Sequence, residues 1–172
     1  MNTFKTLIDE KDLQTRIKQL AEQIDKDYYN EEIQVLSVLK GASFFTIDLC
    51  KNMKNEMKIE FIELCSYGDE TKSTGTVILK KDVIQNIKGK NILIVEDIVD
   101  TGNTLLFLLE HIKTKQPKSV KICTLLDKPN RRKVDVNIDY IGFKIPNKFV
   151  LGYGLDYKEY YRNLPYIAFL EE

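Results

Sequence analysis

The sequence predicts an α/β fold built on a largely parallel sheet. Strand-like and helix-like segments alternate along the chain, which is the pattern of a parallel sheet flanked by helices. Residues 90–96 form the most buried-looking of the expected strands, and a helix-like segment follows this strand at 105–113. The 172 residues fit one domain, so we expect a single domain over residues 1–172.

The spacing of apolar residues assigns the elements in chain order. Apolar positions at helical intervals, from Leu13 to Tyr28, predict an amphipathic helix over 10–29. Further helices are expected at 42–53 and 105–113, and strands at 33–39, 57–64, 76–82, 90–96 and 119–127, with short strands near 140–145, 148–153 and 166–170. The polar segment 65–75 and the basic segment 128–133 are expected as loops.

Composition excludes several classes of protein. The 26 Lys and Arg residues balance the 26 Asp and Glu residues, so no overall field draws the chain to nucleic acid, and any polyanion site must be local. The three cysteines show no metal-binding spacing, and the chain has one histidine. The N-terminus lacks the apolar core of a signal peptide, and no run approaches a membrane span. We therefore expect a cytoplasmic protein that binds neither nucleic acid nor a membrane.

The segment KNILIVEDIVDTGNT, residues 90–104, places three carboxylates where a buried strand gives way to a helix. In open α/β sheets, ligands bind outside the carboxyl ends of the strands. The first N–H groups of the following helix carry partial positive charge, and residues 101–104 add hydroxyl and amide donors. Gly102 also permits an unusual backbone turn. The loop is therefore a candidate phosphate cradle.

The carboxylates Glu96, Asp97 and Asp100 would repel a phosphate held beside them. At ~5 Å and an effective dielectric near 20, each pair of unit charges costs about 3 kcal/mol. The carboxylates could instead accept hydrogen bonds from sugar hydroxyls, or a hard cation such as Mg²⁺ could lie between the charges. A ligand with a phosphate, a vicinal diol and bound Mg²⁺ satisfies both arrangements. The alternative is that Asp97 and Asp100 form turns while Asn103 or Thr104 caps the helix.

Beyond these physical features, ILIVEDIVDTGNTL resembles the phosphoribosyl diphosphate (PRPP) binding motif of type I phosphoribosyltransferases. The segments VLKGASFF, CSYGDETKSTG, TLLDKPNRR and FVLGYGLDY resemble, in the same order, hypoxanthine-guanine phosphoribosyltransferases of the bacterial kind, and the likeness spans about residues 5–170. It implies the type I phosphoribosyltransferase fold, a mostly parallel twisted sheet flanked by helices, with a small hood formed by the N- and C-terminal segments. It also implies purine salvage: transfer of the phosphoribosyl group from PRPP to N9 of hypoxanthine or guanine, giving IMP or GMP and pyrophosphate, with Mg²⁺.

The resemblance implies a role for each residue of the central segment. Glu96 and Asp97 would bind the ribose hydroxyls, directly or through Mg²⁺, and Asp100 would exchange a proton with N7 of the purine. General acid–base help of this kind supplies roughly 10²–10⁴-fold. The 5-phosphate would be held by Thr101, Gly102, Asn103 and Thr104. The one imidazole, His111, falls two turns along the helix and is expected on its surface, which makes it a poor base.

The pyrophosphate and purine sites are likewise implied by resemblance. Lys40 and Gly41 would bind pyrophosphate together with Arg162, and the family often has a cis peptide before this lysine. Lys128 would donate to the 6-oxo group, which an adenine amino group could not replace. Phe149 would stack on the base and Val150 would contact it through the backbone. Asp156 would bind a second Mg²⁺ through its side chain, with its carbonyl near the exocyclic amine of guanine. Judged without the family, Phe149 would be a core residue, and Lys128 and Arg162 would be solvated.

The expected loop 65–75 matches a mobile lid in the family, with Ser66 and Tyr67 at its start. Closure of the lid would protect a reactive transition state from water. A mobile lid also predicts protease cutting near 66–75, which a PRPP analogue with Mg²⁺ would slow.

One rival function is a PRPP-sensing regulator. Against it, no DNA-binding domain is expected before residue 5 or after residue 170, and no basic face is evident. A second rival is a transferase that uses xanthine. The family forms homodimers or homotetramers, and the sequence does not distinguish these.

Overall fold

The structure is a computed structural model that describes residues 4–67 and 76–171. Its elements are β1 (Phe4–Ile8), α1 (Glu10–Asp27), β2 (Ile33–Leu39), α2 (Ser43–Asn52), β3 (Met57–Tyr67), β4 (Thr76–Lys81), β5 (Asn91–Val99), α3 (Asn103–Thr114), β6 (Ser119–Asp127), the 3₁₀ helix η1 (Pro129–Arg131), β7 (Tyr140–Lys144), β8 (Val150–Leu151) and β9 (Ile167–Leu170). Strands and helices alternate through the middle of the chain, as the sequence predicts.

A six-stranded sheet in the order β4-β3-β2-β5-β6-β7 forms the centre of the molecule. The neighbours from β3 to β7 pair in parallel, and β4 pairs with β3 in the antiparallel direction. The two central strands, β2 and β5, are buried along nearly their whole length, as the apolar runs of the sequence indicate. The α/β fold with a largely parallel sheet is therefore confirmed.

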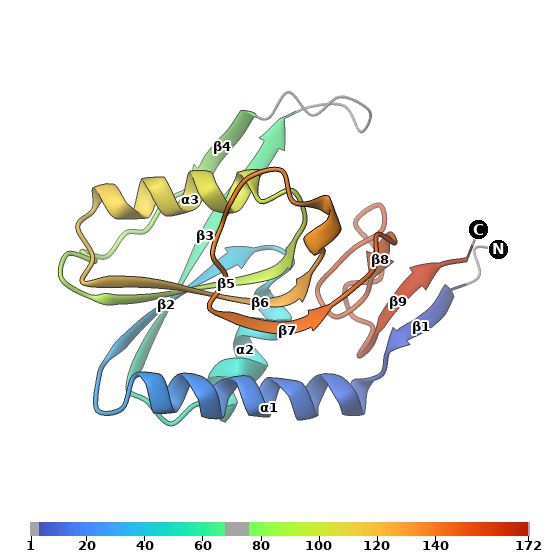
Figure 1. Ribbon diagram of the computed structural model, residues 1–172, viewed down its shortest axis with the longest axis horizontal. Helices are drawn as coiled ribbons and strands as arrows, with labels where there is room; N and C mark the ends of the chain where they lie inside the picture. The colour runs from blue at the N-terminus through green and yellow to red at the C-terminus, as the bar shows by residue number, and fades with distance from the viewer. Residues whose placement is uncertain (1–3, 68–75, 172) are drawn as a thin grey trace.

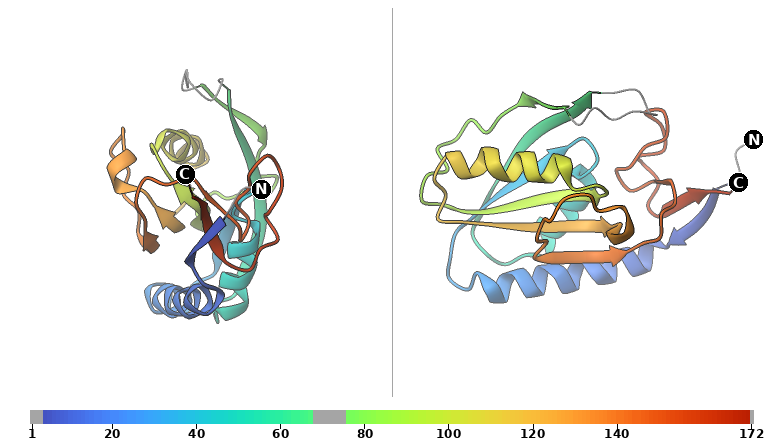
Figure 2. Two further views of the ribbon diagram at one scale, coloured as in Figure 1. Left: turned by 90° about the vertical axis from the view of Figure 1, so that its right-hand side faces the viewer. Right: turned by 45° about the horizontal axis from the view of Figure 1, so that its top comes forward.

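Helices cover both faces of this sheet. Figures 1 and 2 show α1 and α2 on one face and α3 on the other. The spacing of Leu13, Ile17, Leu20 and Ile24 turns one stripe of α1 fully into the core, and burying each such side chain contributes about 1.5–3 kcal/mol. Asp9 begins α1 because its side chain accepts a hydrogen bond from the backbone N–H of Asp12 at 2.8 Å.

A second, smaller sheet in the order β1-β9-β8 joins the two ends of the chain. Its strands are antiparallel, and Phe4 at the start of β1 pairs with Leu170 at the end of β9 (Figure 1). This sheet stands beyond the carboxyl ends of the parallel strands, so the hood implied by the family resemblance is present. The hood strand β1 was not among the strands expected from the sequence.

Two element boundaries differ from the expectations in ways that matter for function. β5 continues to Val99, so Glu96 and Asp97 lie within the strand rather than after it. β3 continues to Tyr67, so residues 65–67 are strand and not loop, because they pair with β4. The expected loop 128–133 contains η1. Within the described part of the chain, no helix is long and apolar enough to cross a membrane.

Candidate active site

The carboxyl ends of β2, β5 and β6 meet the hood at one edge of the central sheet (Figure 1). Parallel strands bring their carboxyl ends to the same edge, where the loops that follow them can share a ligand. Lys40, Asp100 and Lys128 each come directly after one of these strands. Most of the residues that the family resemblance singles out therefore face one region.

The end of β2 is packed tightly against β5 and the hood. The peptide between Leu39 and Lys40 is cis, the form that the resemblance associates with this position. A Cβ atom built on Gly41 would overlap Oδ2 of Asp97, so the carboxylate lies directly over the Gly41 backbone. A Cβ atom on Gly154 would in turn overlap the carbonyl oxygen of Gly41. Both positions need glycine because the backbones and the carboxylate approach so closely.

Glu96 and Asp97 are neighbouring carboxylates near the edge of the sheet. Glu96 is 7% exposed, and burial together with the charge of Asp97 raises its pKa well above the usual range. Burial also raises the pKa of Asp97 to about 6, although the N–H of Ile98 donates to its Oδ1 at 2.7 Å. Neither carboxylate forms an ion pair with a described side chain, although the charge of Arg162 partly opposes the rise in the pKa of Asp97. Such carboxylates favour a cation or a hydroxyl-bearing ligand.

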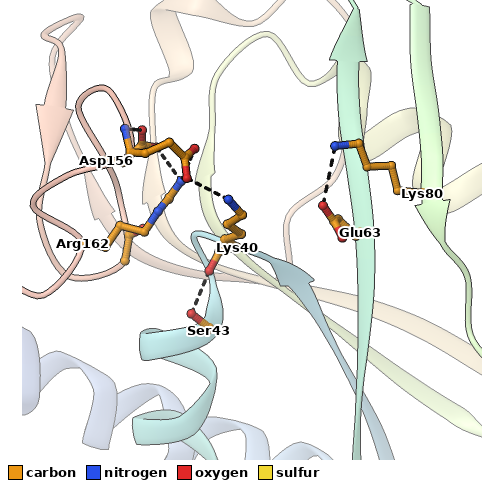
Figure 3. Close-up of polar contacts among 8 residues, drawn as sticks. Lys40, Ser43, Glu63, Lys80, Asp156 and Arg162 are labelled. Carbon is orange, nitrogen blue, oxygen red and sulfur yellow. Dashed lines mark hydrogen bonds and ion pairs between the residues drawn. The ribbon is translucent and has the colours of Figure 1, made fainter.

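Cations gather on the hood side of the same edge. Lys40 Nζ lies 2.7 Å from Oε2 of Glu159, and Nη2 of Arg162 lies 3.0 Å from Oδ1 of Asp156 (Figure 3). Arg162 also donates to the carbonyl of Gly154 at 2.8 Å and to Oε1 of Glu159 at 3.1 Å. The structure thus brings Lys40 close to Asp156 and Arg162, which lie far from it in the sequence.

The loop before α3 has the shape expected of a phosphate cradle. Gly102 has φ = +89°, a left-handed conformation, and α3 begins at Asn103. The N–H of Asn103 is 3.4 Å from Oγ1 of Thr101, and the N–H of Leu106 donates to the carbonyl of Gly102 at 2.9 Å. No side chain caps this helix end, so Asn103 and Thr104 do not serve as the caps considered above. Apart from the long contact of the Asn103 N–H with Thr101, the first-turn donors are left for an anion.

Asp100 and Lys128 stand at the ends of adjacent strands. The backbone N–H of Lys128 donates to the carbonyl of Val99 at 3.0 Å, which ties the two strand ends together. Lys128 is 8% exposed; burial lowers the pKa of its ammonium, and the nearby charge of Asp100 opposes this. Arg131 Nε lies 3.0 Å from Oδ1 of Asp100. Lys128 is therefore not the solvated lysine expected without the family.

Phe149 and Val150 lie where the chain enters the hood. Phe149 is 54% exposed and meets the Tyr157 ring edge-on, with the centroids 5.7 Å apart, so the expectation of a core residue was wrong. An exposed aromatic face is available for stacking. Val150 is buried in β8 and pairs with Phe169 of β9.

The expected lid falls partly outside the described residues. Ser66 and Tyr67 end β3, where their backbones pair with Val77 and Thr76 of β4. Residues 68–75 are not described, so the lid stays a prediction. His111 is only partly exposed, since its Nε2 lies 2.9 Å from Oδ1 of Asp82 on the α3 side of the sheet. His111 lies well along α3 from the loop that precedes this helix, which fits the expectation that His111 is a poor base.

Two further groups at this edge were not found from the sequence. Arg132 makes a short ion pair with Asp127, which is 4% exposed, and its side chain lies against Gly102. Glu159 links Lys40 to Arg162. The basic run KPNRRK was a signal for Arg132, but nothing in the run distinguishes Arg132 from Arg131.

The fold is that of a phosphoribosyltransferase: the chain belongs to the phosphoribosyl transferase domain family, whose pattern it matches over residues 5–158. The likeness extends to a particular branch. The chain is 48% identical over 169 residues to the hypoxanthine phosphoribosyltransferase of Buchnera aphidicola subsp. Schizaphis graminum, covering 97% of this chain and 96% of that protein. It is 44% identical over 167 residues to the hypoxanthine-guanine phosphoribosyltransferase of Bacillus subtilis, covering 97% and 93%.

Solved structures agree with this placement. A crystal structure of a hypoxanthine-guanine phosphoribosyltransferase from Bacillus anthracis superimposes with a TM-score of 0.94 at 51% identity, covering 99% of this chain and all of that one. The chain is accordingly a member of the hypoxanthine-guanine branch of phosphoribosyltransferases.

Proposed function

We propose that this protein transfers the phosphoribosyl group of PRPP to N9 of hypoxanthine or guanine, giving IMP or GMP and pyrophosphate. The observation that carries the proposal is the division of one sheet edge into three adjacent parts. The carboxylates of Glu96 and Asp97 suit a diol, the uncapped N-terminus of α3 suits a phosphate, and the cations Lys40 and Arg162 suit a second anionic group. PRPP carries these groups on one molecule.

The carboxylates fit a magnesium ion that is shared with substrate. No group of three ligating His, Cys, Asp or Glu side chains occurs among the described residues, so this part of the chain does not supply a complete cage. Mg²⁺ characteristically uses one or two carboxylates together with substrate phosphates and water. Glu96 and Asp97 would hold one ion and Asp156 a second. When bound, Mg²⁺ would neutralise charge on PRPP and orient the pyrophosphate leaving group.

The chain's own residues would position the sugar and the base. Residues 101–104 would bind the 5-phosphate through N–H and hydroxyl groups, which fixes the ribose beside β5. Asp100 would hold or supply the proton at N7, using the carboxylate oxygen that Arg131 leaves free.

Purine selectivity would come from Lys128 and the hood. Its ammonium would donate to the 6-oxo group, and a buried donor left without an acceptor disfavours adenine. Phe149 would stack on the ring, and base–aromatic stacking contributes about 1–3 kcal/mol. The backbone of Val150 would contact the base edge.

The deciding experiment is an assay of nucleotide formation with PRPP and Mg²⁺. Hypoxanthine, guanine, xanthine and adenine would be supplied separately, and the product nucleotide separated by chromatography. We expect IMP and GMP, and no AMP, because adenine offers no 6-oxo acceptor. Lack of product with every 6-oxopurine would refute the proposal, and product with xanthine alone would reassign the substrate. A reaction in excess EDTA tests the requirement for Mg²⁺.

We further propose that the enzyme works in the cytoplasm as a homodimer or homotetramer. Both statements rest on the family resemblance, and sedimentation of the purified protein distinguishes the two assemblies.

A further inference from the structure

Glu159 joins the two cations that the proposed function assigns to pyrophosphate. Its Oε2 lies 2.7 Å from Lys40 Nζ, and its Oε1 accepts from Nη2 of Arg162 at 3.1 Å. Each carboxylate oxygen therefore serves one cation. Figure 3 shows Asp156 beside Arg162, with the Lys40 side chain directed toward the same place. A pyrophosphate group would contact the same two cations through its own oxygens.

The backbone around Glu159 is bent in an unusual way. Lys158, Glu159 and Tyr161 have φ values of 53°, 67° and 72°, in the left-handed region that residues other than glycine rarely occupy. The turn is closed by Tyr157 and Tyr160, which exchange backbone hydrogen bonds at 3.1 Å, and by the Glu159 N–H, which donates to Oδ2 of Asp156 at 2.8 Å. Backbone strain of this kind concentrates at ligand sites. Here it directs Glu159 at the cations.

The contacts of Glu159 suit a group that exchanges with a ligand. The Glu159 side chain is 67% exposed and Lys40 is also largely exposed. Exposed ion pairs of this kind contribute little stability. Arg162, by contrast, keeps its contacts with the Gly154 carbonyl and with Asp156 when Glu159 moves away. The cations would therefore stay in place while their anion changes.

We propose that Glu159 is a built-in counter-ion of the pyrophosphate site, which the pyrophosphate group of substrate or product displaces when it binds. The inference rests on the proposed function, which assigns Lys40 and Arg162 to pyrophosphate. Glu159 keeps the two cations paired and lowers the net affinity of the site for pyrophosphate. Lower affinity favours release of pyrophosphate as a product.

The test compares Glu159→Gln with a matched variant at the opposite end of the sheet. Glutamine has nearly the same shape but no charge. Glu31 is a suitable control because it is also a partly exposed carboxylate with two partners, Lys118 Nζ and Asn91 Nδ2, each at 2.6 Å. Glu31→Gln therefore removes an equivalent charge away from the site. The binding of inorganic pyrophosphate with Mg²⁺ would be measured by titration calorimetry for all three proteins.

We expect Glu159→Gln to bind pyrophosphate roughly 3–10-fold more tightly than the wild type, as the loss of one competing exposed ion pair implies. Glu31→Gln should bind with the wild-type affinity. A purely structural role for Glu159 predicts the opposite direction, because disordering Arg162 would weaken binding. Unchanged or weaker binding by Glu159→Gln overturns the proposal, as does an equal gain in Glu31→Gln or no binding by any of the three proteins.

The nucleotide assay separates this inference from the proposed function. If the wild type forms IMP or GMP while Glu159→Gln binds pyrophosphate no more tightly, the inference alone fails. If the wild type forms no nucleotide but Glu159→Gln still gains affinity, the counter-ion role stands and the assigned reaction fails.

Discussion

The two ends of the parallel sheet carry charged side chains in different ways. At the amino end, Asp27 accepts hydrogen bonds from the Tyr140 hydroxyl at 2.6 Å and Lys121 at 3.0 Å. Those two contacts lower the pKa of Asp27 despite some burial. At the carboxyl end, burial raises the pKa of both Glu96 and Asp97. The protein therefore satisfies Asp27 at the amino end, whereas Glu96 and Asp97 at the carboxyl end are left for a ligand.

This difference separates charges that stabilise the fold from charges that carry function. A carboxylate with its own cation and hydroxyl partners gains nothing from a ligand, whereas a desolvated carboxylate without a cation binds one readily. The contrast predicts that equivalent substitutions at the two ends will affect different quantities. Substitutions at the amino end should change stability alone, whereas those at the carboxyl end should also change activity.

The largest contrast is expected between Asp100→Asn and Asp27→Asn. Asparagine cannot exchange the N7 proton, so kcat for IMP formation should fall by roughly 10³-fold with little change in PRPP affinity. Asp27→Asn should leave kcat within about twofold. It should lower the free energy of unfolding by about 0.5–1 kcal/mol, since the Lys121 ion pair is partly exposed. Steady-state kinetics and urea unfolding of both variants provide the comparison.

An unchanged kcat in Asp100→Asn would remove Asp100 from its proposed role. A comparable loss of kcat in Asp27→Asn would show that the two ends are not functionally distinct.

A second comparison sets a buried ion pair against an exposed one. Arg132→Met would leave Asp127 buried without its cation, which should lower the free energy of unfolding by about 3 kcal/mol. Because Arg132 lies against Gly102, the variant should also weaken PRPP binding. Lys118→Met removes an exposed partner of Glu31 and should cost less than about 1 kcal/mol. Equal losses in urea unfolding would contradict the distinction.

The sequence predicted the elements that have strong apolar periodicity. Strand β2 was expected at its observed bounds, because a buried strand is a nearly continuous apolar run. Helix α1 was expected within two residues of its bounds, because its buried stripe repeats at helical spacing. The hood strand β1 was missed because its five residues, FKTLI, bury little and gain their partner β9 from the far end of the chain. Pairing between distant segments leaves no local pattern.

The candidate site was predictable to the extent that its residues share one segment. Residues 96–104 pointed to a phosphate and a diol from their own chemistry, although β5 was expected to end too early. Lys40, Asp156 and Arg162 were identified through the family, because only the folded chain brings them together. The contact between Gly41 and Asp97 had no signal in the sequence, since steric exclusion depends on how β2 and β5 are packed.

That contact gives a third, smaller comparison between glycines at opposite ends of the sheet. A methyl group on Gly41 must displace the Asp97 carboxylate, and misplacement of about 1 Å can reduce catalysis about 10²-fold. We therefore expect Gly41→Ala to lose about 10²-fold in kcat/KM for PRPP. Gly89, before β5, has φ = +70°, and a Cβ atom added there would meet no atom within 4 Å. Gly89→Ala should lose about 1 kcal/mol of stability and keep its activity. Full activity in Gly41→Ala would show that the Asp97 position is not critical.

The smallest expected effect concerns pH, and its sign differs between the two ends. The pKa of Asp97 is raised to about 6 in the folded protein, so the folded state binds the proton more tightly than the unfolded state. Asp97 therefore destabilises the fold increasingly as pH rises from about 4 through about 6. Asp97→Asn should gain about 1–2 kcal/mol in free energy of unfolding at pH 8, allowing for partial exposure of the side chain, and little at pH 4.

Asp27 should show the opposite dependence, because its pKa is lowered in the folded state. Its contribution is present above the usual pKa of an aspartate and is lost as pH falls, so Asp27→Asn should be less stable than the wild type at pH 8 and approach it in acid. Urea unfolding at pH 4, 6 and 8 would place the two differences on opposite sides of zero. A loss of stability in Asp97→Asn at pH 8 would mean that the fold itself satisfies this carboxylate, and the separation of structural from functional charge would then fail at its most direct point.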